Sequence, residues 1–299
     1  MELRHIRYFL AVAEERNVTR AAEKLGIGQP PLSQQIHALE KEMGVRLFRR
    51  TGHGVVLTEA GEAFAIDAKR LLDDARQAVH KAQSAGRGEM GHLNIGFTGS
   101  AVFNPLVLDL IRRFRQSYPG VELTLTEGNT AQLLAHLEDG RLDVAFVRPG
   151  DQTPSSIVFD HITLEPMKIV LPATHRLSKK RKIQLAMLAE EPFVLLPREA
   201  SPMLNDVIVG ACRNAGFEPI LGQQAPQLSS VVNLVAAEFG VSMVPASVSQ
   251  IHAEGVVYVD TEGISVNIRL GVASRRDTVT AKTANFLTIT RHMLSTSGS

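Results

Sequence analysis

The sequence predicts a multidomain protein in which a mainly α-helical N-terminal region is followed by an α/β region of two lobes. Over roughly the first ninety residues, apolar positions recur at spacings of three and four, as in amphipathic helices. The remaining two hundred or so alternate short β-prone runs with helical stretches. The glycine-rich stretch SAGRGEMGH lies between the two patterns. A length of 299 residues and 44% apolar composition leave room for two or three cores.

Composition argues against several classes of protein. No apolar run approaches the roughly 20 residues needed to span a bilayer, and charge interrupts the N-terminal MELRHIRYFLAVAEER, so we expect a cytoplasmic protein without a membrane segment. The single cysteine, Cys212, cannot form an intrachain disulfide or a Cys-based zinc cluster, and its context VIVGACRNAG favours helix packing. We expect no metal and no cofactor.

The first two predicted helices are short. In residues 3 to 15, LRHIRYFLAVAEE, the apolar side chains form the stripe of an amphipathic helix. The next stretch, NVTRAAEKLG, offers Asn17 as an N-cap and Gly26 as a left-handed stop. A helix of about two turns follows from this spacing.

A third helix is predicted in GQPPLSQQIHALEKEMG. Pro30 and Pro31 suit its first turn, because amide hydrogens there have no intrahelical partner. Four apolar side chains at spacings of four, three and four are expected to face the core: Leu32, Ile36, Leu39 and Met43. The exposed side then carries groups able to recognise base edges: Gln29, Ser33, Gln34 and His37. Taken alone, such a face would favour a merely polar surface.

The second and third helices form a helix-turn-helix, whose second helix enters the DNA major groove. The stretch VRLFRRTGHGVVLT that follows predicts a hairpin, which beside such a helix is a wing. Its arginines are expected to reach phosphates or the minor groove. The candidate DNA-contacting residues are Thr19, Arg20, Gln29, Pro30, Pro31, Ser33, Gln34, His37, Arg49, Arg50 and Thr51.

Residues 58 to 88 predict one long helix with Thr58 as its cap. Its apolar positions alternate spacings of four and three, the period of a coiled-coil seam: Phe64, Ala68, Leu71, Ala75, Ala78 and Ala82. We therefore expect a dimerisation helix. The alternative is a long amphipathic helix that lies on its own α/β region.

Candidate ligand residues follow the ends of predicted strands, where open α/β sheets bind ligands. Ser100 follows HLNIGF, Thr130 follows VELTLTEGN, and Arg148 ends DVAFV. Together with nearby helix N-termini, such groups can hold a carboxylate. Each alone is also consistent with a helix cap or a surface ion pair. The candidate effector-binding residues are Phe97, Ser100, Thr130, Arg148, Ser201, Pro202 and Met203.

No catalytic motif is apparent. The stretch GFTGSAV lacks the G-x-S-x-G elbow, and no two histidines show H-E-x-x-H spacing, so we expect no enzyme. A small-molecule binding or transport protein without DNA function is the alternative, but it leaves residues 1 to 88 unexplained.

Over essentially its whole length the chain resembles the LysR-type transcriptional regulators. The most specific stretches are MELRHIRYFLAVAEERNVTRAAEKLGIGQPPLSQQIHALEKEMGVRLFRRTGHGVVLTEAG and NLVAAEFGVSMVPAS. The branch it is most similar to responds to benzoate, muconate and related intermediates of aromatic catabolism. The resemblance implies a winged helix-turn-helix over 1–58, a linker and dimerisation helix over 59–88, and an effector-binding domain over 89–299. Its two Rossmann-like lobes, resembling periplasmic binding proteins, are implied to be 89–162 with 267–299 (lobe I) and 163–266 (lobe II).

The resemblance also implies partners and ligand contacts. Such proteins form tetramers as dimers of dimers, bind promoter DNA and contact RNA polymerase, often as activators. The branch's contacts with small anionic effectors, aromatic or dicarboxylic acids, fall on Ser100, Thr130, Arg148, Pro202 and Met203. The chain departs from the pattern at Met203, near which the branch carries phenylalanine, and at Gln34, where many members carry arginine.

Overall fold

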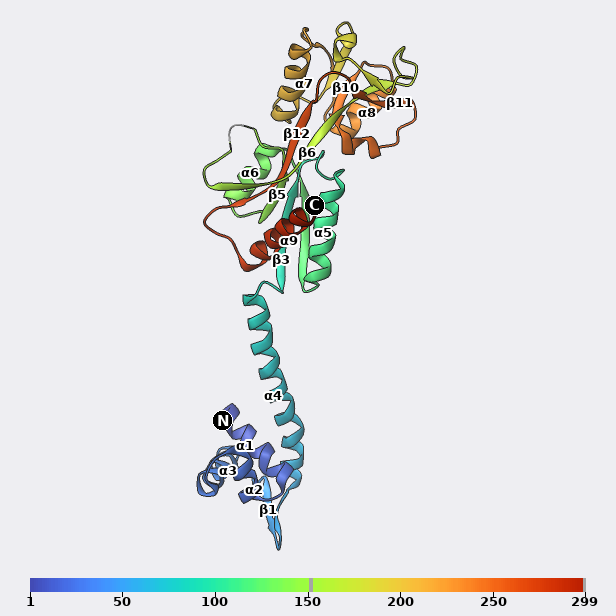
Figure 1. The fold of residues 1–299 in the computed structure, drawn as a ribbon. Helices are drawn as coiled ribbons and strands as arrows, with labels where there is room; N and C mark the ends of the chain where they lie inside the picture. The colour runs from blue at the N-terminus through green and yellow to red at the C-terminus, as the bar shows by residue number, and fades with distance from the viewer. Residues whose placement is uncertain (151–152, 298–299) are drawn as a thin grey trace. The chain divides into compact units, whose positions relative to one another are not determined.

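The computed structural model describes residues 1–150 and 153–297. It divides into two compact units, Met1–Ser84 and Ala85–Ser299 (Figure 1). No helix among the described residues is long and apolar enough to cross a membrane.

The first unit contains three short helices, a hairpin and most of a long helix. Their bounds are α1 (Leu3–Glu15), α2 (Val18–Leu25), α3 (Gln29–Met43), β1 (Phe48–Thr51), β2 (Gly54–Leu57) and α4 (Glu59–Gly86). The predicted signals act as expected: the Asn17 side chain accepts from the amides of Thr19 and Arg20, and Gly26 ends α2 with a φ of 68°. The Thr58 hydroxyl accepts from the Gly61 amide at 3.0 Å. The predicted helix-turn-helix and hairpin are confirmed.

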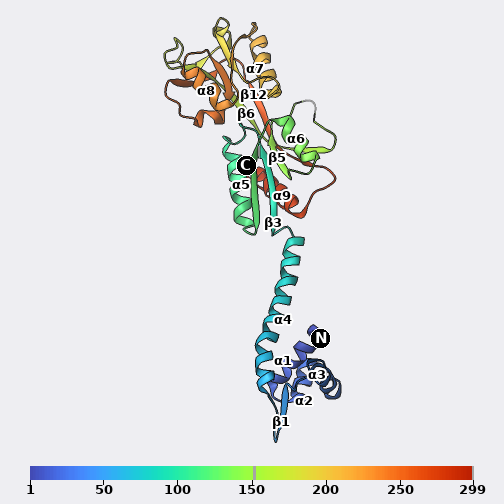
Figure 2. The ribbon, with the colours of Figure 1, turned by 180° about the vertical axis from the view of Figure 1, so that it is seen from behind.

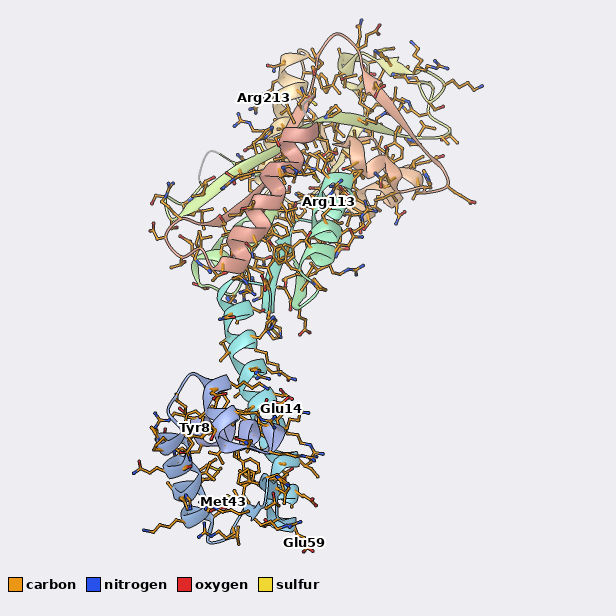
Figure 3. The ribbon with its side chains drawn as sticks, turned by 60° about the horizontal axis from the view of Figure 1, so that its bottom comes forward. Tyr8, Glu14, Met43, Glu59, Arg113 and Arg213 are labelled. Carbon is orange, nitrogen blue, oxygen red and sulfur yellow. The ribbon has the colours of Figure 1, made fainter. Side chains whose placement is uncertain are left out.

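The core of the first unit is built around Phe9, whose ring centroid lies 5.2 Å from Phe48 and 4.9 Å from Phe64. From α3 it receives Leu32, Ile36 and Leu39, all buried as predicted. The prediction for Met43 is wrong, since that side chain is 36% exposed. Met43 is the last residue of α3 (Figure 3), where Gly44 ends the helix, so its side chain extends beyond the core.

The predicted seam along α4 is wrong in its first half. Phe64 packs against Phe9, and Ala68 is fully buried in the same core, so both serve their own winged domain. Farther along, Leu71 is 42% exposed, and Ala78 and Ala82 are exposed. A 3.5-residue period predicts an apolar stripe along a helix but not which surface covers that stripe. The sequence therefore could not distinguish the first half of α4, which packs in its own domain, from the exposed second half.

The second unit has two lobes that share strands. Lobe I contains β3 (Gly91–Phe97), α5 (Pro105–Ser117), β4 (Val121–Glu127), α6 (Thr130–Glu138), β5 (Val144–Val147), β12 (Asn267–Arg275) and α9 (Ala281–Ser297). Lobe II contains β7 (Lys182–Ile183), β8 (Pro192–Leu195), α7 (Pro202–Asn214), β9 (Ile220–Gln224), α8 (Leu228–Ala236), β10 (Ser242–Pro245), β11 (Val256–Thr261) and the 3-10 helices Leu185–Leu188 and Ala246–Gln250. The long strand β6 (Ile157–Pro172) belongs to both.

Lobe I is a sheet covered on both faces. Helices α5 and α9 pack on one face, where Phe114, Phe146 and Phe286 meet, and α6 packs on the other through Leu133 and Leu137 (Figures 1 and 2). Strands β4, β3 and β5 run parallel, whereas β12 is antiparallel to β5 and β6. The sheet is therefore mixed and not mainly parallel, because the returning strand β12 enters it in reverse.

The chain passes from lobe I to lobe II within β6. Its residues up to Pro166 pair with β12 in lobe I, while Met167 onward pairs with β10 and β11 in lobe II. The first crossing thus falls at residues 166 and 167 and not near the predicted residue 162. The return follows Val266, where β12 begins at Asn267.

Candidate functional site

The predicted DNA-contacting residues all lie on the first unit. Thr19 and Arg20 are exposed on α2, and Arg49, Arg50 and Thr51 are exposed on the hairpin. On α3 the exposed members are Gln29, Pro30, Pro31, Gln34 and His37, while Ser33 is half-buried.

Three side chains spaced four residues apart along α3 are held in place by hydrogen bonds. The Gln29 amide nitrogen donates to the Ser33 hydroxyl at 2.8 Å. The His37 Nδ1 lies 2.9 Å from the Ser33 carbonyl oxygen. Because a carbonyl oxygen only accepts, we assign the proton to Nδ1, which leaves Nε2 of neutral His37 as an acceptor. The polar face of α3 is therefore partly pre-arranged.

Glu40 fixes the hairpin to α3, and sequence reasoning missed it. Its buried carboxylate accepts from the amides of Leu47 and Phe48 at 2.8 and 3.1 Å and pairs with Arg46 at 2.8 Å. Although burial acts to raise the pKa of Glu40, these hydrogen bonds outweigh it and hold that pKa below its ordinary value. The hairpin that carries Arg49 and Arg50 is thus tied to α3.

A cavity of about 420 Å³ lies between the lobes of the second unit. Lobe I borders it with Ser100, Thr130 and Arg148, and lobe II with Ser201 and Gln227. Three helices begin at this cavity: α6 after Asn129, α7 after Ser201 and α8 after Gln227. Helix N-termini carry partial positive charge and free amides, so the arrangement favours an anion.

The hydroxyls at the cavity are not used as helix caps. Asn129 caps α6 through a reciprocal capping box with Gln132, which leaves the Thr130 side chain free of that duty. Ser201 occupies the N-cap position of α7, but its side chain makes no cap hydrogen bond. Ser100 accepts from Arg148 Nε at 2.8 Å. The capping alternative raised from the sequence therefore does not apply to these three residues.

Arg148 is buried and not a surface ion-pair partner. Its side chain is 4% exposed, and Nη2 donates to Glu165 Oε2 at 2.7 Å. The other terminal nitrogen, Nη1, has no hydrogen-bond partner among the described residues. Burial lowers the pKa of Arg148 while Glu165 opposes that shift. An arginine remains charged in proteins, so Nη1 keeps unused, buried donors in a residue that lines the cavity.

Glu165 is the residue that sequence reasoning missed at this cleft. It stands in β6 next to the lobe crossing and also accepts from the Ser247 amide of lobe II at 2.7 Å and the Asn104 side chain of lobe I at 3.3 Å. Burial acts to raise the pKa of Glu165, but attraction to Arg148 and the Ser247 hydrogen bond hold it below its ordinary value. A lone acidic residue in the apolar run ITLEPMKIVLP was the available signal.

A second cavity of about 490 Å³ shares Thr130, Arg148 and Ser201 with the first. Pro202 and Met203 border it as predicted. Phe97 borders neither cavity and packs against the core of lobe I instead, because its side chain points from β3 into the sheet face covered by α5 and α9. Among the described residues, no cluster of His, Cys, Asp and Glu could hold a metal ion.

Two family models match the chain. Residues 3–62 match the bacterial regulatory helix-turn-helix protein model of the lysR family, and residues 86–295 match the LysR substrate binding domain. The chain belongs to the LysR family. The HTH-type transcriptional regulator BudR of Raoultella terrigena is 42% identical, over 92% of this chain and 95% of that protein.

Solved LysR structures agree with both units. CbnR, a LysR family transcriptional regulator, matches with a TM-score of 0.87 and 30% identity over 97% of this chain and all of that chain. Full-length CbnR in complex with its target DNA matches with a TM-score of 0.85 and 29% identity, over 98% of this chain and 100% of that one. This LysR protein is therefore a DNA-binding transcriptional regulator with an effector-binding domain and not an enzyme.

Proposed function

We propose that this regulator is controlled by a small acid whose carboxylate binds in the cavity between the lobes. The observation that supports this most is the buried Arg148, whose Nη1 has no hydrogen-bond partner in the described part of the chain, at a cavity where three helices begin. Thr130 and Ser201 add hydroxyls without a capping role. Aromatic acids such as benzoate and unsaturated dicarboxylic acids such as muconate are the first candidates, since Pro202 and Met203 offer apolar contact beside the anchor.

Binding would act on the lobes because the cavity has walls from both. A ligand that bridges Thr130 of lobe I and Ser201 of lobe II stabilises the closed arrangement over the open one. A differential affinity of a few kcal/mol shifts such a population substantially. In the promoter complex, closure would change the angle between paired winged domains, and with it DNA bending and contact with RNA polymerase.

A thermal-shift titration of the full chain tests the effector site. Benzoate, muconate and succinate are titrated, and a specific ligand raises the midpoint progressively with concentration. Thr130→Val and Ser201→Ala should weaken binding, while Thr124→Val, on β4 and outside both cavities, serves as the control. Equal binding by the two cavity variants and the control would contradict the proposed anchor.

We place the sequence-reading surface on α3 and the phosphate contacts on the wing. Gln29, Ser33 and His37 form the reading row, and Arg50 supplies a phosphate contact. A folded Ser33→Ala, Arg50→Ala double variant should lose operator binding, measured by fluorescence anisotropy at fixed salt. Unchanged binding would refute this placement, since a regulator with an intact fold would then read DNA elsewhere.

We also propose a homodimer formed through the linker region 59–88, and a tetramer of two such dimers. Within the first unit, a surface groove of about 510 Å³ runs between α1 and α4. Its apolar lining is supplied by Leu3, Leu72, Ala75 and Val79, and Val79 is 58% exposed. Exposed apolar surface of this kind marks an interaction site, and the second copy of the chain is its proposed occupant.

A further inference from the structure

A carboxylate without a partner borders the same cavity as Arg148. Glu127 ends β4 and is exposed, and it has no hydrogen-bond or ion-pair partner among the described residues. A Cβ added at Gly99 would lie 2.8 Å from Glu127 Oε1, which places this oxygen beside the loop that carries Ser100. Asn129 and Gln132 already cap α6, so Glu127 is not needed for that helix. It therefore offers an acceptor to whatever occupies the cavity.

The charges around the two cavities limit how much negative charge a ligand can bring. Arg148 is neutralised by Glu165 at 2.7 Å, and Arg198 at the second cavity is paired with Asp206 at 2.9 Å. Glu127 leaves one carboxylate in excess. Against this stand three helix N-termini, each equivalent to about half a positive charge. With Glu127 counted against them, the termini leave about half a positive charge, which offsets about half of one ligand carboxylate, whereas the charge of a second carboxylate would be wholly uncompensated.

Resting on the proposed effector site, we infer that the ligand is a monocarboxylate that also carries a hydrogen-bond donor, either a hydroxyl or an ammonium group. Its carboxylate is held by Arg148 Nη1, Thr130 and Ser201, and its donor is accepted by Glu127. A dicarboxylate would place its second anion against the unpaired Glu127 and is disfavoured. This narrows the aromatic or dicarboxylic expectation to hydroxy or amino acids with a single carboxylate.

Two matched series of acids test the inference on the full chain. The first is benzoate, salicylate, anthranilate and phthalate, and the second is propanoate, lactate, alanine and succinate, each titrated by thermal shift. In a series that binds, the acids that carry a hydrogen-bond donor should bind about tenfold more tightly than the unsubstituted acid, as expected for a hydrogen bond to a charged group. Lactate against alanine tells a hydroxyl from an ammonium donor, and salicylate against anthranilate compares a hydroxyl with a neutral amino group.

Variants assign the effect to Glu127. Glu127→Met removes both the acceptor and the charge, so it should remove the advantage of the donor and improve dicarboxylate binding, while Glu122→Met, exposed on the same strand, should leave both unchanged. Ser201→Ala should weaken all acids alike. Tightest binding by phthalate or succinate, or a donor advantage that survives in Glu127→Met, overturns the inference but leaves the acid-binding site intact. No midpoint shift with any of the eight acids would contradict the effector site and the inference with it.

Discussion

Arg148 Nη2 and Glu165 Oε2 lie 2.7 Å apart, and both side chains are almost completely buried next to the crossing between the lobes. Glu165 also accepts from Ser247 of lobe II and Asn104 of lobe I. One carboxylate thus contacts the arginine at the cavity and both lobes. A ligand anion that attracts Arg148 competes with Glu165 for the same guanidinium. Because Glu165 lies in β6, ligand binding in the cavity is linked to the strand that passes between the lobes.

The buried pair predicts an unequal response to single and double substitution. Glu165→Gln leaves the Arg148 charge buried without its counter-ion, and should lower the free energy of unfolding by about 3 to 5 kcal/mol. An Arg148→Met, Glu165→Leu double variant removes both charges and should recover most of that loss. Urea denaturation of the full chain, followed by circular dichroism, measures both. A double variant that is less stable than Glu165→Gln would contradict this account of the pair.

The contacts of Glu40 predict that the stability of the winged domain depends on pH. Glu40→Gln weakens two amide hydrogen bonds and one ion pair, and should lower the free energy of unfolding by about 1.5 to 3 kcal/mol. Because the pKa of Glu40 in the folded state lies below its ordinary value of about 4.3, its contribution is complete above about pH 5 and is lost as the pH falls through the lowered pKa. Glu42→Gln, exposed on the same helix, is the matched control. Unfolding midpoints measured from pH 3 to 8, in steps of about one pH unit, check this prediction. The midpoints of Glu40→Gln and Glu42→Gln should become equal at low pH.

The sequence predicted the core positions and site residues that depend on neighbours in the chain. It missed the residue whose role depends on contacts between distant segments. Leu32, Ile36 and Leu39 follow from helical spacing, and Arg148 follows from its place at the end of a strand. Glu165 could not be found in that way. Its role depends on β6 pairing first with β12 and then with β10 and β11, which brings together residues about one hundred positions apart.

The two halves of α4 predict different consequences of substitution. Phe64→Ala removes a ring from the core of the winged domain and should lower the free energy of unfolding by about 3 to 5 kcal/mol. Val79→Asp places a charge in the exposed groove and should convert dimers to monomers. Sedimentation velocity together with thermal unfolding separates the two effects. Ile66→Asp is the control, because Ile66 is 59% exposed like Val79 but lies outside the groove, and dissociation by this variant would argue against the groove as the interface.

Cys212 predicts a thiol that does not react in the folded protein. It is fully buried within lobe II, and this burial raises its pKa to about 12. At pH 8, about one thiol in ten thousand is then a thiolate, against roughly one in four for a free cysteine. Iodoacetamide labelling of the native chain, followed by mass spectrometry, should therefore be at least about a thousandfold slower than labelling in urea. Rapid native labelling would show that lobe II opens around α7, since the thiolate is the reacting species and water must reach the sulfur for it to form.

Cys212→Ala should leave the acid-induced thermal shift unchanged, which tests whether the thiol takes part in effector binding at all.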